Sequence, residues 1–255
     1  MAVPVTPVRL GDDRTAGGRP DPVCPVSASG NNDLRCQAHG GSVRLMAVSL
    51  AVAAEGRTPA LLLRPWQVAD MPGLLAAMDR EYPAGGLRSN PYVGAGLRRW
   101  TGPRDENEAA SWLSGQDRGW QSGDWLALAV VGRRGRVVGQ VGLMNREDGC
   151  VGDGSFGEIS YWTAADARGL GIAPAAVRAM TRWAFASFSS DGLPLIMLVH
   201  DLDNPASCRV AEKSGYEFSE ISPANPPSWY AAGHVHVAVA RPGMPMPASL
   251  LRGGD

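Results

Sequence analysis

A short segment that contains two glycines is the part of the sequence best suited to bind a phosphate. It reads Arg168-Gly169-Leu170-Gly171-Ile172-Ala173 and lies between an expected strand and an expected long helix. The first turn of a helix has N–H groups without intrahelical partners and a partial positive charge, so it attracts anions. Gly169 and Gly171 allow the main chain to approach a ligand, and Arg168 adds positive charge. The segment predicts a phosphate or diphosphate site, although a tight strand-to-helix connection would need the same glycines.

Two common nucleotide-binding patterns do not fit this segment. The dinucleotide fingerprint GxGxxG requires a third glycine, which is absent here. The Walker pattern GxxxxGK[ST] is absent as well. The expected ligand is therefore a phosphate of another kind of molecule.

Changes in the periodicity of apolar residues along the chain predict the helices and strands that must position this segment. Strands are expected over residues 60–66, 124–131, 136–145, 156–163, 193–199, 216–222 and 234–240, and helices over 68–79, 106–117, 173–188 and 205–213. Pro174 falls in the first turn of the third helix, where proline is tolerated. The order is β-α-α-β-β-β-α-β-α-β-β, which predicts a mixed α/β class with one central mixed sheet and a strand–helix–strand crossover.

The two ends of the chain differ from its centre. Residues 1–58 contain many prolines and glycines and few large apolar side chains, so we expect a disordered extension, with a short helix over 43–54. Residues 59–242 form the expected domain, and residues 243–255 the expected tail. Net charge is −1, which argues against a nucleic-acid partner. The four cysteines form no CxxC pair, and no apolar run reaches membrane-spanning length, so a reduced, cytoplasmic protein is expected.

Three ordered motifs resemble the GNAT N-acetyltransferase superfamily. Arg168–Ala173 matches its Arg/Gln-x-x-Gly-x-Gly/Ala signature at all four specified positions. Glu158-Ile159-Ser160-Tyr161-Trp162 is similar to the Glu-Ile-Gly-Tyr-Trp strand of the ribosomal-protein N-terminal acetyltransferases. Asn204 to Ser207, followed by Glu212-Lys213-Ser214-Gly215-Tyr216, resembles the Asn-x-x-Ser…Glu-Lys-x-Gly-Phe segment of that subgroup, and Leu63-Arg64-Pro65 resembles its opening strand.

This resemblance implies acetyl-CoA as co-substrate and assigns its contacts. The amides of the phosphate segment would hold the diphosphate of coenzyme A: Gly169, Leu170, Gly171, Ile172 and Ala173. Pro174 departs from the pattern because it has no N–H to donate. The strand edge formed by Tyr161, Trp162 and Thr163 would pair with the pantetheine arm, whose amides imitate a backbone. Asn204 would hold the same arm, although its residue type equally suits a helix cap.

The resemblance also implies roles in catalysis. Glu158 would be the base that removes a proton from the amine; the alternative is a surface or sheet-edge carboxylate paired with an arginine. Ser207 would assist the departing thiolate; the alternative is an ordinary helix serine. Many superfamily members carry a tyrosine acid seven residues after the asparagine, where this chain has Ala211. Tyr216 is expected to pack in the core.

The expected function is acetyl transfer from acetyl-CoA to a primary amine, either a protein N-terminus or a small-molecule amine, by a monomer or homodimer. The alternatives are a non-catalytic acyl-CoA-binding module and, more remotely, another nucleotide-binding fold. His234 and His236 share one face of the last strand, but no third ligand is evident near them, so no metal site is expected. His200 is expected to be a structural histidine, and Trp100 either shapes the acceptor cleft or packs in the core.

Overall fold

The computed structural model describes residues 34–38, 41–45, 48–81, 102–145, 156–188, 193–224 and 232–240. Trp100, residues 1–33 and the expected tail lie outside these ranges. No helix in the described ranges is long and apolar enough to cross a membrane.

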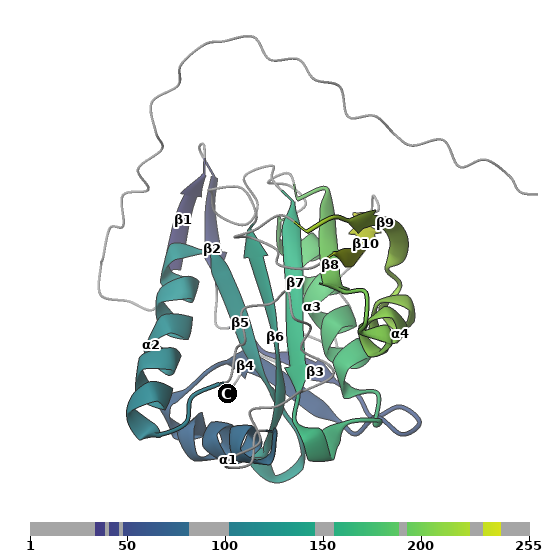
Figure 1. Cartoon of the computed structure of the whole chain (residues 1–255). Helices are drawn as coiled ribbons and strands as arrows, with labels where there is room; N and C mark the ends of the chain where they lie inside the picture. Colours follow the sequence, from purple (N-terminus) through teal and green to yellow (C-terminus); the bar gives the residue numbers. More distant parts are fainter. Residues whose placement is uncertain are drawn as a thin grey trace, which may run out of the picture.

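An eight-stranded mixed sheet forms the centre of the domain (Figure 1). The strand order is β3-β4-β5-β6-β7-β8-β10-β9, and β1 and β2 form a separate antiparallel two-stranded sheet. The strands are β1 (Leu34–Ala38), β2 (Gly41–Leu45), β3 (Leu50–Val52), β4 (Leu61–Pro65), β5 (Trp125–Val131), β6 (Val137–Asn145), β7 (Gly157–Thr163), β8 (Leu195–Asp201), β9 (Glu217–Ser222) and β10 (Gly233–Val239). All pairings within the sheet are antiparallel except β7 with β8.

In the described part of the chain, four α-helices cover the sheet: α1 (Met71–Glu81), α2 (Glu106–Ser122), α3 (Ile172–Phe188) and α4 (Pro205–Ser214). Helix α1 packs with α2, and α3 packs with α4. The two pairs lie on opposite faces of the sheet. Two neighbouring residues of β7 show this, because neighbouring side chains of a strand point to opposite faces. On β7, Trp162 stacks on Trp66, which in turn contacts Trp112 of α2, whereas the Tyr161 hydroxyl reaches Ser207 of α4.

Local sequence accounts for the helix boundaries. The Asp105 side chain accepts a hydrogen bond from the Glu108 N–H and caps α2, and Gly123 ends that helix with a left-handed backbone. Gly215 ends α4 in the same way, with φ of 84°. A bidentate ion pair between Arg64 and Asp70, with both N–O distances 2.7 Å, ties the end of β4 to the turn that leads into α1.

The mixed α/β class with one sheet is confirmed, and the predicted element order is found from β4 onward. The short helix expected over residues 43–54 is wrong. This stretch contains parts of two strands, and β3 pairs antiparallel with β4, Leu50 opposite Leu63. Both leucines are fully buried, so the sheet begins before the expected boundary at residue 59. Burial beside β4 outweighs the weak helical pattern of this stretch.

Candidate active site

The phosphate segment connects β7 to α3 through a short 3₁₀ turn, Ala165–Ala167. Gly169 and Gly171 both have left-handed backbones, with φ of 73° and 75°. A Cβ on Gly171 would also collide with Thr58 Oγ1, whereas a Cβ on Gly169 would meet nothing within 4 Å. The glycines therefore serve the geometry of the connection, as the simpler alternative required, and they leave the segment partly exposed.

Helix α3 begins directly after this segment, at Ile172. The carbonyl of Gly171 accepts from the Ala175 N–H at 3.2 Å. The N–H groups of Ile172 and Ala173 precede the first intrahelical donor and point out of the helix start, where they suit an anion. The Arg168 side chain is exposed, and its Nε donates to the carbonyl of Thr163 at 3.3 Å, which holds the guanidinium beside the end of β7.

A split in the sheet lies next to this helix start. β7 pairs with β6 along its whole length, from Gly157 to Thr163. On its other side it pairs with β8 only at Gly157 and Glu158. The edge that carries Tyr161, Trp162 and Thr163 therefore has no strand partner on the β8 side among the described residues. Such an edge offers main-chain donors and acceptors to an extended ligand that contains amides.

Asn204 and Ser207 stand at the start of α4, which follows β8. Asn204 is 6% exposed and caps the helix, with Oδ1 accepting from the Ser207 N–H at 3.2 Å. The capping role is therefore present, and a contact with the pantetheine arm stays a prediction. Ser207 Oγ accepts a hydrogen bond of 2.8 Å from the Tyr161 hydroxyl, which bridges β7 and α4. Burial raises the pKa of Tyr161 to about 12, partly offset by the bond to Ser207, so this hydroxyl keeps its proton at neutral pH.

Glu158 lies inside the sheet at the point where β7 and β8 separate. It is 6% exposed and stands opposite Met144 of β6 and Met197 of β8. The alternative of a surface or sheet-edge carboxylate is therefore wrong. Strand alternation puts Glu158 on the same face as Trp162, toward α1 and α2.

Three partly buried tryptophans line this same face. The ring of Trp66 meets Trp112 edge-on at 4.9 Å between centroids and stacks on Trp162 at 6.4 Å. Trp66 Nε1 donates to Gln140 Oε1 at 2.9 Å. Trp162 belongs to the same strand motif as Glu158, whereas nothing in the sequence placed Trp66 and Trp112 beside that strand.

Other expected residues are placed as follows. Tyr216 is buried in the core and its hydroxyl lies 2.7 Å from Thr181 Oγ1, which confirms the packing role. Ala211 is also fully buried. Tyr161 was expected only as part of a strand edge, and the position of its hydroxyl beside Ser207 was not predicted. The Tyr-Trp pair of the strand motif was the only signal for it.

The premise that no third ligand lies near His234 and His236 is wrong. The structure places His200 and Cys208 beside them. These residues come together because β8 and β10 are neighbours in the sheet and α4 covers both, an arrangement that spacing along the chain does not reveal.

Comparisons with known proteins agree with this geometry. A family model described as an acetyltransferase (GNAT) domain matches residues 60–217, and a sequence search of curated proteins gave no match. Among solved structures, RimJ from Mycobacterium smegmatis in complex with CoA-disulfide is similar at 19% identity and a TM-score of 0.59, over 76% of this chain and 87% of that one. A putative ribosomal-protein-serine acetyltransferase from Vibrio cholerae is similar at 17% identity and a TM-score of 0.56, over 76% of this chain and 99% of that one.

The microcin C7 self-immunity acetyltransferase MccE, in complex with acetyl-CoA and AMP, is similar at 13% identity and a TM-score of 0.56, over 70% of this chain and 92% of that one. The likeness to these structures concerns the fold, whereas the family model spans most of the domain. The chain belongs to the GNAT acetyltransferases, and its co-substrate is acetyl-CoA.

Proposed function

We propose that this protein transfers the acetyl group of acetyl-CoA to a primary amine. The observation that carries the proposal is the split between β7 and β8, which opens beside the left-handed phosphate segment and the start of α3. The diphosphate would bind the amides of residues 169–173, and the pantetheine arm would pair with the edge formed by Tyr161, Trp162 and Thr163. This arrangement would bring the thioester near Glu158 and the start of α4.

Glu158 would act as the base. A primary amine is largely protonated near neutral pH, so a proton must leave before nitrogen attacks the thioester carbonyl. A buried carboxylate where the strands separate can accept this proton, directly or through a water molecule. A main-chain N–H near Trp162 or Thr163 would polarise the carbonyl oxygen.

Ser207 would assist the thiolate that leaves. Because the Tyr161 hydroxyl donates to Ser207 Oγ, the hydrogen of Ser207 is left to point elsewhere. We infer that it points toward the sulfur of the departing thiolate and donates a hydrogen bond that stabilises its negative charge. Tyr161 is then a positioning residue, since its own pKa is too high for it to lose a proton readily.

The acceptor would lie on the face of the sheet that carries Glu158 and the tryptophans Trp66, Trp112 and Trp162. Aromatic rings offer apolar contact and attract cations, so this surface suits the carbon skeleton of an amine and its ammonium group. A protein N-terminus is the acceptor class that the sequence motifs favour. A small-molecule amine is the second class.

The test supplies the purified chain with acetyl-CoA and a panel of amines, and follows free thiol. The panel contains short peptides with a free N-terminus, the same peptides with a blocked N-terminus, free amino acids and polyamine-like small molecules. Turnover with free but not blocked peptides supports the protein acceptor, and turnover with small amines alone supports the second class. CoA binding without turnover on any amine favours the non-catalytic module, and absence of CoA binding refutes the proposal.

The variant Glu158→Gln distinguishes an acetyltransferase from a non-catalytic acyl-CoA-binding module. General-base catalysis contributes about 10²–10⁴-fold, so kcat should fall by about that factor while calorimetry shows unchanged affinity for CoA. Glu217→Gln is the matched control, because Glu217 is an exposed carboxylate on β9, and it should keep full activity. Equal rates for the two variants would exclude the base role of Glu158.

A further inference from the structure

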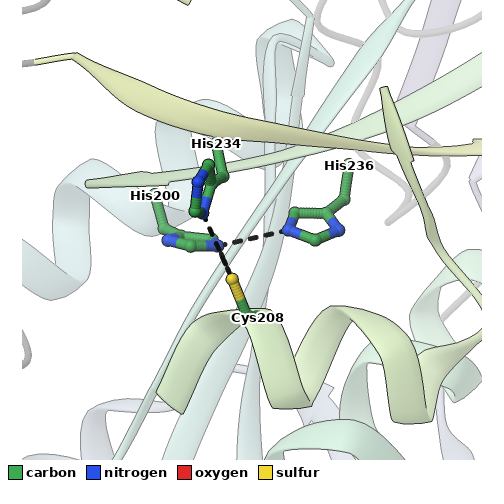
Figure 2. Close-up of side chains that lie close together, drawn as sticks. All are labelled: His200, Cys208, His234 and His236. Carbon is green, nitrogen blue, oxygen red and sulfur yellow. Dashed lines mark hydrogen bonds between the residues drawn. The ribbon is translucent and has the colours of Figure 1, made fainter. Parts of the chain in front are cut away.

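Three histidines and one cysteine form a compact cluster on the face of the sheet covered by α4 (Figure 2). His200 is near the end of β8, His234 and His236 lie on β10, and Cys208 lies on α4. His200 and His234 are direct partners in the antiparallel β8–β10 pair, and His236 follows two residues later, so the three rings share one face. The cluster therefore joins three elements that are distant in sequence.

The ligand-forming atoms of the cluster lie close together. Cys208 Sγ is 3.3 Å from His200 Nε2 and 3.3 Å from His234 Nδ1, and His200 Nε2 is 3.3 Å from His236 Nε2. The four residues each offer one such atom, all within 4.8 Å of one another. Zinc ligands about 2.0–2.3 Å from a tetrahedral ion lie roughly 3.3 Å apart for two nitrogens and 3.6 Å apart for nitrogen and sulfur. The three 3.3 Å distances fit a shared ion, and the remaining pairs of ligand atoms, which lie within 4.8 Å, must draw closer as the ion binds.

The orientation of His200 suits a ligand. Its Nδ1 lies 2.8 Å from the backbone carbonyl of Asp201 and can act toward that oxygen only as a donor. The hydrogen is thereby placed on Nδ1, and the lone pair of Nε2 points into the cluster. Metal-binding histidines commonly donate the second ring nitrogen to a carbonyl in this way. His200 thus has both the tautomer and the outer partner of a zinc ligand.

Burial favours the neutral imidazoles that metals require. His200 is 4% exposed and His236 is 2% exposed, and a charged ring at such buried positions would be costly. Among the described residues, His236 Nδ1 has no hydrogen-bond partner. The edge of Phe218 packs against the rings of His234 and His236 and holds them from the β9 side. Hydrogen bonds within the cluster therefore do not satisfy all of its nitrogens.

We propose that His200, Cys208, His234 and His236 bind one Zn²⁺ ion in a tetrahedral His₃Cys site. Three nitrogens and one sulfur are donors that zinc prefers, and four protein ligands leave no open position for a catalytic water, so the ion is structural. Binding displaces the thiol proton of Cys208 to solvent, and the sulfur coordinates as thiolate. The ion fastens α4 to β8 and β10 and thereby fixes Ser207, the neighbour of Cys208, relative to Tyr161.

Metal content provides the first test. The full chain is produced without a histidine tag in zinc-supplemented medium, gel-filtered and analysed by mass spectrometry of the elements. We expect about one zinc per chain in the wild type, and at least a tenfold lower content in Cys208→Ala and His236→Gln. Cys150→Ser and His39→Gln are matched controls for the loss of a cysteine and a histidine elsewhere in the sequence, and both should retain zinc.

A second measurement keeps the proposal testable if those variants fail to fold. Wild-type protein stripped with a chelator is titrated with Co²⁺. A tetrahedral site with one thiolate should give intense visible bands and a sulfur-to-cobalt charge-transfer band in the near ultraviolet, both lost when Zn²⁺ is added. If Co²⁺ added to the zinc-free wild type gave none of these bands, the cluster would be held by hydrogen bonds alone and the proposal would be overturned. If folded Cys208→Ala and folded His236→Gln both kept as much zinc as the wild type, the metal would lie elsewhere and the proposal would again be overturned. None of these readouts depends on acetyl transfer.

Discussion

Alanine at Gly169 and alanine at Gly171 should differ in their effects, although the two glycines share almost the same backbone conformation. Both have φ near +75°, a left-handed region that costs other residues roughly 1–2 kcal/mol. Each substitution should therefore lower the free energy of unfolding by about that amount. At Gly169 the added methyl group meets nothing within 4 Å, so strain is the whole cost.

At Gly171 the methyl group also collides with Thr58 Oγ1. Relief requires a rotation of the Thr58 side chain or a shift of the loop, and overpacking of this kind costs about 1–3 kcal/mol. The total loss for Gly171→Ala is then about 2–5 kcal/mol. Thr58→Ala removes the colliding oxygen, so the double variant should recover about 1 kcal/mol or more, whereas Thr58→Ala should add independently to Gly169→Ala.

Urea unfolding of the three single and two double variants without CoA measures these differences, and calorimetric titration with CoA measures the functional consequence. A loop displaced by the collision moves the amides proposed to hold the diphosphate. Each 1.4 kcal/mol of lost contact weakens binding tenfold, so Gly171→Ala should bind CoA at least about tenfold more weakly, with partial recovery in the Thr58 double variant.

Two results would refute this reasoning. The first result is that, in both double variants, the changes in the free energy of unfolding add to within about 0.5 kcal/mol. It would show that Thr58 does not collide with the methyl group added at Gly171. The second result is a Gly171→Ala protein that loses the expected stability but binds CoA with full affinity. It would show that the loop does not bind the diphosphate.

Three further outcomes follow from the site and the sheet. Gly139→Ala should destabilise the fold by about 2 kcal/mol or more in thermal or urea unfolding, because its Cβ would collide with the backbone carbonyl of Trp162, which has no side-chain freedom to move away. Arg64→Met should cost about 3 kcal/mol in the same assays, since it removes the bidentate partner of the Asp70 carboxylate, which is 6% exposed; a loss below 1 kcal/mol would contradict this. Between about pH 10 and pH 12 the unfolded chain releases the Tyr161 proton and the folded chain keeps it, so stability should fall as the pH rises, and Tyr161→Phe should make this fall shallower; parallel curves would exclude the raised pKa.

Much of the fold was predictable because short stretches of sequence are enough to predict its helices and strands. The helices α2, α3 and α4 have apolar stripes and acidic or proline starts, and α2 and α4 end at a glycine, all within one short window of sequence. The phosphate segment is also local, since its residues are consecutive. Its placement between β7 and α3 followed from the change of periodicity on either side.

The remainder depends on contacts between distant residues. β3 is only three residues long, and its strand conformation comes from pairing with β4. Thr58, which closes on Gly171, falls in the stretch that composition assigned to a disordered extension. The hydrogen bond from Tyr161 to Ser207 spans 46 positions, and the proximity of His200 to His236 depends on the register of β8 with β10. No local pattern encodes such pairings.

The short parallel contact between β7 and β8 makes the centre of the sheet a seam. Only two residue pairs join the strands there, and the strands on the far side, with α4, are otherwise held mainly by α3. Regions with few backbone links open more readily than the whole molecule unfolds. The C-terminal strands with α4 would thus form a separate cooperative unit, whose amides exchange with deuterium sooner than those of β5 and β6. A ligand lodged in the seam would slow that exchange in proportion to its occupancy, so the protein would tighten as acetyl-CoA becomes abundant.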